Sequence, residues 1–148
     1  MHDDLIKRCY VLARRAVEHG NHPFGALLWK DGEVLMEAEN TVVTQKDVTG
    51  HAELNLVRMA SKRLDLEMLN GSTLYTSTEP CIMCQGSIYW AGILRIVYGV
   101  SGSSLAALQD ASWYVSSRDN YQQMQASIEV SGPILENEGM DIHKRFWK

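Results

Sequence analysis

Two short motifs bring together side chains that bind zinc. His51 stands two residues before Glu53, and Cys81 and Cys84 follow later in a Cys-x-x-Cys spacing. Histidine nitrogen and cysteine thiolate are common zinc ligands, and a site with three protein ligands keeps a fourth position open for water. His51, Cys81 and Cys84 therefore predict one zinc ion (Zn2+) per subunit, in a site of the catalytic type.

Glu53 supplies the proton carrier that hydrolysis at such a site requires. Zinc lowers the pKa of a bound water to about 7, and a neighbouring carboxylate can take its proton. His-x-Glu followed by Pro-Cys-x-x-Cys is the signature of zinc-dependent deaminases. We therefore expect zinc-bound hydroxide to attack a ring carbon that carries an amino group, and Glu53 to pass protons to the ring nitrogen and the departing ammonia.

Taken alone, each motif is compatible with a different role. His51 could cap a helix, and a redox dithiol would use the same spacing as Cys81 and Cys84. A structural zinc site would want a fourth ligand, but Cys9 is expected as a buried, inert thiol on an apolar helix face. A non-catalytic zinc module is the alternative of another class, and Glu53 argues against it because a structural site needs no carboxylate. The remaining histidines have no partner spacing and are expected at the surface or in local caps: His2, His19, His22 and His143.

Two helix starts must place the zinc-binding residues side by side. Apolar periodicity predicts one helix from about residue 51 to 64, and Pro80 in a first helical turn predicts another that Gly92 ends. Cys81 and Cys84 then share one helix face, because residues three apart are neighbours. The positive end of the helix dipole would also stabilise their thiolates.

The rest of the chain alternates helices and strands. Asp-Gly between two apolar runs predicts a hairpin with strands 26–29 and 33–38. The stretch 40–50 is interpreted as a loop, and 116–125 as a loop or a solvated helix. This order predicts one mixed sheet with helices on both faces. The other expected elements are a helix from Asp3 or Asp4 to about Gly20, strands at 73–77 and 94–100, a short helix capped by Ser103 or Ser104, a short strand at 128–130 and a helix at 137–147.

Composition and charge restrict the classes of partner. The 148 residues, 45% hydrophobic and 22% charged, suit one globular domain over residues 1–148. The formal net charge of -4 argues against a nucleic acid partner, because a surface that follows phosphates usually makes a domain basic. No apolar run reaches the about 18 residues of a transmembrane helix, and the N-terminus lacks signal-peptide features. We therefore expect no membrane partner and a cytoplasmic location.

At these residues the chain resembles the cytidine deaminase-like superfamily. More narrowly, it resembles the branch that holds bacterial guanine deaminases, tRNA adenosine deaminases and fungal cytosine deaminases. The resemblance covers about residues 3–111 and is carried by both zinc motifs, by Asn40, and by the segments 22–26 and 86–91. It implies an α/β fold, a three-layer α/β/α sandwich around a five-stranded mixed sheet.

The resemblance also implies contacts with a substrate base. Asn40 would hydrogen-bond the base, the backbone N–H of Ala52 would meet a carbonyl or ring edge, and Phe24 and Trp90 would help to wall the pocket. Two simpler roles stay open from the residues alone. Asn40 could only hold a turn, and the two aromatic side chains could belong to the core.

The Tyr-Trp pair at 89–90 is most similar to the guanine deaminases. In that group the C-terminal segment closes over an active site, sometimes that of the partner subunit, so Phe146 and Trp147 are candidates for a lid. The chain departs from the group after the last core strand, where only Asp110 represents its acidic cluster. Guanine is the first substrate expected among free nucleobases and nucleosides, with tRNA adenosine and cytosine or another aminated heterocycle as alternatives, and a homodimer is implied.

Overall fold

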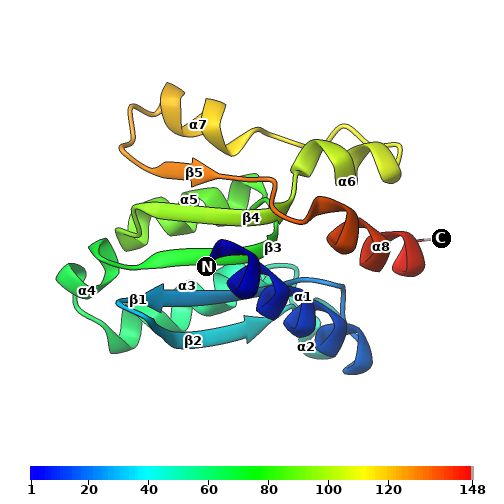
Figure 1. Cartoon of the computed structure of the whole chain (residues 1–148), viewed down its shortest axis with the longest axis horizontal. Helices are drawn as coiled ribbons and strands as arrows, with labels where there is room; N and C mark the ends of the chain where they lie inside the picture. The colour runs from blue at the N-terminus through cyan, green and yellow to red at the C-terminus, as the bar shows by residue number, and fades with distance from the viewer. Residues whose placement is uncertain (148) are drawn as a thin grey trace.

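One five-stranded sheet lies between helices in the computed structural model, which describes residues 1–147 (Figure 1). Its strands lie in the order β2-β1-β3-β4-β5. β1 is antiparallel to β2 and β3, whereas β4 is parallel to β3 and β5, so the sheet is mixed, as expected. The strands are β1 (Gly25–Lys30), β2 (Glu33–Glu39), β3 (Thr73–Thr78), β4 (Arg95–Val100) and β5 (Glu129–Ser131).

Helices cover both faces of the sheet, which confirms the three-layer α/β/α sandwich. Figure 1 shows α1 in front of the strands and α3 and α5 behind them. Side chains on a strand alternate between faces, so Leu27 packs with the α1 cluster and its neighbour Leu28 with the α3 and α5 cluster. The helices are α1 (His2–Glu18), α2 (Val42–Gln45), α3 (Ala52–Arg63), α4 (Leu66–Asn70), α5 (Ile82–Ala91), α6 (Gly102–Leu108), α7 (Ser117–Gln123) and α8 (Glu136–Phe146).

The predicted hairpin is confirmed. Asp31 and Gly32 both have positive φ, 50° and 84°, and connect β1 to β2. Two central residues with positive φ make the tight turn whose twist matches that of paired strands. The hairpin places β1 between β2 and the central strand β3, whose end leads to Cys81.

Several helix boundaries differ from the expectation, mostly for capping reasons. α1 begins at His2, so the two aspartates lie in its first turn and do not cap it. Ser101, not Ser103 or Ser104, caps α6, because its side chain accepts the N–H three residues later. The helices α2 and α4 were not predicted, since four or five residues carry little periodicity. No helix within residues 1–147 is long and apolar enough to cross a membrane.

The polar stretch 116–125 contains the helix α7. It is not a solvated helix throughout, because Tyr121 is fully buried and its hydroxyl donates to the backbone carbonyl of Gln85 at 2.7 Å. The tail then forms β5 and α8, as predicted. Gly139 is tolerated within α8 because a Cβ there would lie 2.5 Å from Val100 and 2.6 Å from the Tyr10 hydroxyl oxygen.

Candidate metal centre

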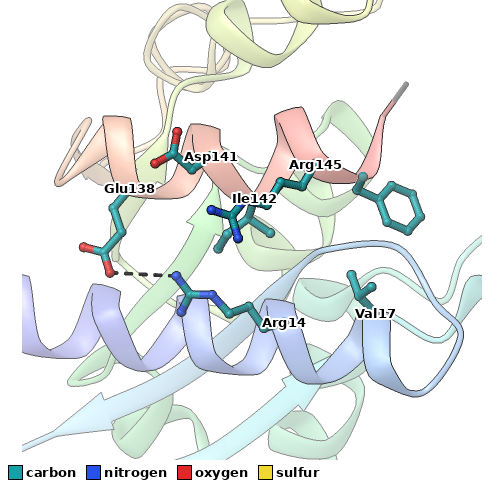
Figure 2. Close-up of a pocket in the computed structure, with 7 residues that line it drawn as sticks. Arg14, Val17, Glu138, Asp141, Ile142 and Arg145 are labelled. Atoms are coloured by element: carbon teal, nitrogen blue, oxygen red, sulfur yellow. Dashed lines mark ion pairs between the residues drawn. The ribbon is translucent and has the colours of Figure 1, made fainter.

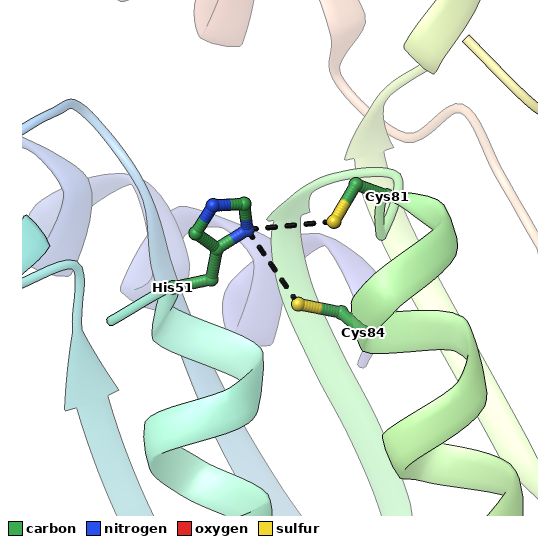
Figure 3. Close-up of side chains that lie close together, drawn as sticks. All are labelled: His51, Cys81 and Cys84. Carbon is green, nitrogen blue, oxygen red and sulfur yellow. Dashed lines mark hydrogen bonds between the residues drawn. The ribbon is translucent and has the colours of Figure 1, made fainter. Parts of the chain in front are cut away.

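The zinc-binding residues lie at the starts of α3 and α5, on the same face of the sheet (Figure 3). His51 is the N-cap of α3 and Cys81 the N-cap of α5, both with extended backbone. Pro80 therefore precedes the helix, whereas the sequence predicted it in the first helical turn. Extended N-cap residues direct the chain away from the helix axis, so His51 and Cys81 meet between the two helix ends.

The geometry of the three side chains fits a zinc ion. His51 Nδ1 lies 3.4 Å from Cys81 Sγ and 3.6 Å from Cys84 Sγ. Zinc bonds of 2.0–2.1 Å to nitrogen and 2.3 Å to sulfur, in a tetrahedral arrangement, separate those atoms by about 3.5 Å. All the possible ligand atoms of His51, Cys81 and Cys84 lie within 4.8 Å of one another. His51, Cys81 and Cys84 would hold the ion as three protein ligands, a number that keeps one position open for water or substrate.

The pKa values of the two thiols shift in opposite directions. A hydrogen bond from Cys84, helped by His51, lowers the pKa of Cys81 to about 4. The same hydrogen bond, together with burial, raises the pKa of Cys84. The hydrogen bond with Cys81 raises the pKa of His51. A metal binds both sulfurs as thiolates and His51 as a neutral imidazole, so its binding would release protons from the site.

Glu53 lies in the first turn of α3 and is only 4% exposed. Burial, with a smaller contribution from the charge of Cys81, raises the pKa of Glu53 to about 7. A carboxyl group with a pKa near the working pH can both accept and donate a proton. This is the property that a proton shuttle beside the metal requires.

His51, Glu53 and Cys81 open into one cavity of about 190 Å³. Its size lies below the about 300–1,000 Å³ of sites for drug-sized ligands, so it suits a small molecule. Sequence reasoning missed half of its lining. Thr78 and Glu79 could have been found from the sequence, because polar residues at the end of a buried strand directly precede the cysteines. Leu105, Gln109 and Trp113 lie in no recognisable pattern. The complete lining is Phe24, His51, Glu53, Thr78, Glu79, Cys81, Leu105, Gln109, Trp113 and Trp147.

Two of the predicted aromatic residues have different outcomes. Phe24 lines the cavity, but Trp90 does not and is 82% exposed. The expectation that Trp90 walls the pocket is therefore not met within one chain. Nine residues separate it from Cys81, which is about two and a half helical turns, so it projects from the opposite side of α5.

Asn40 and Ala52 are not part of the cavity lining, but each adjoins residues that are. The N–H of Asn40 donates to the carbonyl of Phe24 at 3.1 Å, and Ala52 stands between His51 and Glu53. Asn40 is 2% exposed, and its Oδ1 accepts the N–H of Val42 at 3.1 Å and of His22 at 3.4 Å. It therefore holds a turn, and within residues 1–147 no acceptor is found for its Nδ2. Ala52 is buried in the first turn of α3, where a backbone N–H has no acceptor inside the helix.

The C-terminal segment closes one side of the cavity. Trp147 lines it and donates from Nε1 to His143 Nδ1 at 3.0 Å, while His143 Nε2 lies 2.8 Å from Thr78 Oγ1. The expectation of a surface role for His143 is wrong: it is 2% exposed, and burial lowers its pKa to about 4. Phe146 packs edge-on against Trp147 and does not line the cavity.

A second cavity, of about 300 Å³, lies between α1 and α8 (Figure 2). Arg14 and Glu138 face each other across it at 4.0 Å, and Val17 and Phe146 form its apolar end. No histidine or cysteine lines it. Asp110 belongs to neither cavity: it is exposed, with a φ of 50°. The zinc ligands therefore mark the smaller cavity as the candidate site.

Comparison with known proteins agrees with this geometry. The model of the cytidine and deoxycytidylate deaminase zinc-binding region matches residues 1–100. A probable cytosine deaminase of Schizosaccharomyces pombe is 40% identical over 149 residues, covering 96% of this chain and 90% of that protein. The guanine deaminase of Bacillus subtilis is 42% identical over 106 residues, covering 71% of this chain and 68% of that protein.

A solved structure supports the same assignment over nearly the whole chain. It comes from a study of A-to-I editing by tRNA:A34 deaminases at the wobble position of transfer RNA. It has a TM-score of 0.74 and 29% identity, and the match covers 94% of this chain and 98% of that one. The matched family region includes His51, Cys81 and Cys84, so zinc is the metal for this site. The chain belongs to the zinc-binding cytidine and deoxycytidylate deaminase family.

Proposed function

We propose that the protein hydrolyses the exocyclic amino group of a free nucleobase or nucleoside, with guanine as the first substrate to test. The observation that carries the proposal is the convergence of three zinc ligands and a buried carboxyl group on one small cavity. A structural zinc site would have no use for Glu53 in that position.

The mechanism assigns separate tasks to the metal and to Glu53. Zinc, when bound, supplies a Lewis acid that makes a water molecule a better nucleophile at neutral pH. Glu53 takes the proton of the attacking water, and the buried carboxyl group, with its pKa near 7, can give it up again. It gives that proton to the ring nitrogen, then takes the proton of the hydroxyl group added to the ring carbon and gives it to the amine, which leaves as ammonia while the carbonyl forms.

Neighbouring groups would orient the base. The free Nδ2 of Asn40 would donate to a carbonyl of the ring, because its Oδ1 is already occupied by Val42 and His22. The N–H of Ala52 would donate from the start of α3. Phe24 and Trp147 present aromatic surface to the cavity and would pack against the planar ring.

Cytosine is the second candidate. The relative named for cytosine is 40% identical and aligns with 96% of this chain, whereas the relative named for guanine aligns with 71%. Adenosine in tRNA is disfavoured by the net charge of -4, since contacts with phosphates require basic residues. The small cavity agrees with a free base of either kind.

A substrate panel tests the proposal. Zinc-loaded protein would be incubated with guanine, guanosine, cytosine, cytidine, adenine and a tRNA anticodon stem-loop, and the release of ammonia measured. We expect turnover of a free base and the highest kcat/KM on guanine. Turnover of the stem-loop alone would show that the small-molecule assignment is wrong.

The role of Glu53 has its own test. Glu53→Ala should keep its zinc but lower kcat by about 10²–10⁴-fold, the usual contribution of a general acid–base group. Metal content by atomic spectroscopy and the rate of ammonia release would be measured together. Glu67→Ala on α4, which removes an exposed carboxylate, is the matched control and should retain full activity. Retention of wild-type kcat by Glu53→Ala would refute the assigned role.

We also propose that two copies associate through α5. Ile82, Tyr89 and Trp90 expose 51%, 36% and 82% of their surfaces along this helix, and burying them would be favourable. Sedimentation velocity tests this. Wild-type protein should sediment as a dimer and Trp90→Glu as a monomer, and a monomeric wild type at micromolar concentration would contradict the proposal.

A further inference from the structure

A stretch of chain without regular structure forms part of the cavity lining, together with the zinc ligands. We call residues 109–116, between α6 and α7, the wall segment (Figure 1). It contributes Gln109 and Trp113 to the cavity, and Trp113 Nε1 donates to Gln109 Oε1 at 2.8 Å. Residues 111–116 belong to no helix or strand, so no backbone ladder holds them in place.

Gln85 holds this segment from within the zinc-binding helix. It lies one residue after Cys84 in α5 and is 0% exposed. Its Nε2 donates to the carbonyl of Val115 and to the carbonyl of Pro80, both at 2.8 Å. Its Oε1 accepts from Asn120 Nδ2, also at 2.8 Å. One buried amide thus joins the start of α5, the wall segment and α7.

Glu79 binds the first residues of α6 and α7, the two helices that flank the wall segment. Its Oε1 accepts the N–H of Gly102 at 3.0 Å, and its Oε2 accepts the N–H of Ser117 at 2.8 Å and the hydroxyl of Ser117. Glu79 and Gln85 therefore lie on either side of the segment that carries Cys81 and Cys84. The wall segment is attached to the zinc site itself rather than to the sheet edge.

We propose that Gln85 is a positioning residue that holds Gln109 and Trp113 over the cavity and so sets the affinity for the substrate base. This inference rests on the proposed function, because it assumes that the base binds in this cavity. Gln85 takes no part in proton transfer, since its amide is fully engaged with protein groups. Loss of its hydrogen bonds would leave buried carbonyl groups unpaired, which a mobile wall segment would relieve by exposing them to water.

The test compares Gln85→Met with Gln123→Met. Both changes replace glutamine by an apolar side chain of similar length, but Gln123 lies on the exposed side of α7. We expect Gln85→Met to raise KM about tenfold with kcat within about threefold of wild type and zinc content unchanged. Gln123→Met should leave all three unchanged. A fall in kcat without a rise in KM would overturn the proposal.

Hydrogen exchange gives a readout that does not depend on activity. Amides of residues 109–121 should exchange at least about tenfold faster in Gln85→Met than in wild type, while β3 keeps its protection. Unchanged exchange in the wall segment would overturn the proposal even if KM rose. If the wild type acts on no base, the proposed function fails, and exchange still decides whether Gln85 holds the wall. If Gln85→Met does not fold, Asn120→Ala removes one of the same hydrogen bonds and should show the same changes to a smaller degree.

Discussion

The zinc-ligand side of the cavity and its opposite wall differ in how far apart in the chain their parts lie. His51 and Glu53 share one helix start, and Cys81 and Cys84 share another. The wall is assembled from the residue before β1, the end of β3, α6 with the segment after it, and the residue after α8. Local backbone geometry arranges each motif of the zinc-ligand side, whereas long-range packing brings together every part of the wall.

This difference separates chemistry from recognition. The zinc-ligand side uses residue types that few others can replace, because only certain atoms bind zinc or carry protons. The wall uses aromatic, amide and hydroxyl groups, which are common throughout the protein. We therefore expect changes on the ligand side to abolish the reaction, and changes in the wall to alter stability, affinity and selectivity.

The largest effect should come from removing a ligand. Cys84→Ala leaves two protein ligands, so the variant should lose bound zinc and release no detectable ammonia. Cys9→Ala is the matched control: that thiol is 0% exposed in α1 and takes no part in the zinc site, so zinc and activity should persist with a small loss of stability. Stoichiometric zinc in Cys84→Ala, measured by atomic spectroscopy, would contradict the expectation that changes on the zinc-ligand side remove the metal and abolish the reaction.

The next effect concerns stability of the wall at acid pH. His143 has a pKa of about 4 in the folded protein and about 6.5 when unfolded. Between these values the unfolded chain binds the extra proton, so stability is complete above pH 6.5 and declines as pH falls toward 4. The loss should reach about 3 kcal/mol, from a shift of about 2.5 units at about 1.36 kcal/mol each.

Denaturant unfolding at pH 7 and pH 4.5 checks this. The difference in free energy of unfolding between the two pH values should shrink in His143→Gln, because that variant lacks the buried imidazole. An equal pH dependence in wild type and His143→Gln would show that burial of His143 does not hold the C-terminal segment in this way.

The smallest effect distinguishes two tryptophans. Trp147→Ala should raise KM about tenfold with little change in kcat, because Trp147 lines the cavity and, under the proposed function, would pack against the base without moving a proton. Trp90→Ala should leave KM unchanged, because Trp90 projects away from the cavity of its own chain. Steady-state kinetics on the best base decides between them. A rise in KM for Trp90→Ala would show that a second subunit completes the wall.

Much of the fold could be predicted from local patterns. The Asp-Gly turn, the apolar runs of β3 and β4, and the periodicity of α1 and α3 each occupy a few adjacent residues. The prediction was wrong or incomplete where caps and short helices depend on individual hydrogen bonds, as at Ser101. It left α7 undecided because the buried position of Tyr121 depends on a contact with Gln85, far away in the sequence.

The sequence by itself determined the metal and its three ligands. His51, Cys81 and Cys84 can be identified from residue type and short spacing, because few side chains bind zinc and each motif lies at one helix start. Only the tertiary structure decided which aromatic residue faces the cavity. Tryptophan is equally suited to a core, a pocket wall or an exposed helix face, and packing placed Trp147 in the wall and Trp90 outside it.

The tertiary structure also decided the roles of two polar residues that the sequence left without function. His143 and Gln85 have no motif, and each takes its role from partners far away in the chain, Thr78 for the first and Val115 and Asn120 for the second. Burial makes these hydrogen bonds important, because an unpaired polar group costs free energy only where water cannot reach it. The access of water to a side chain is a property of the folded chain and cannot be predicted from a local sequence pattern.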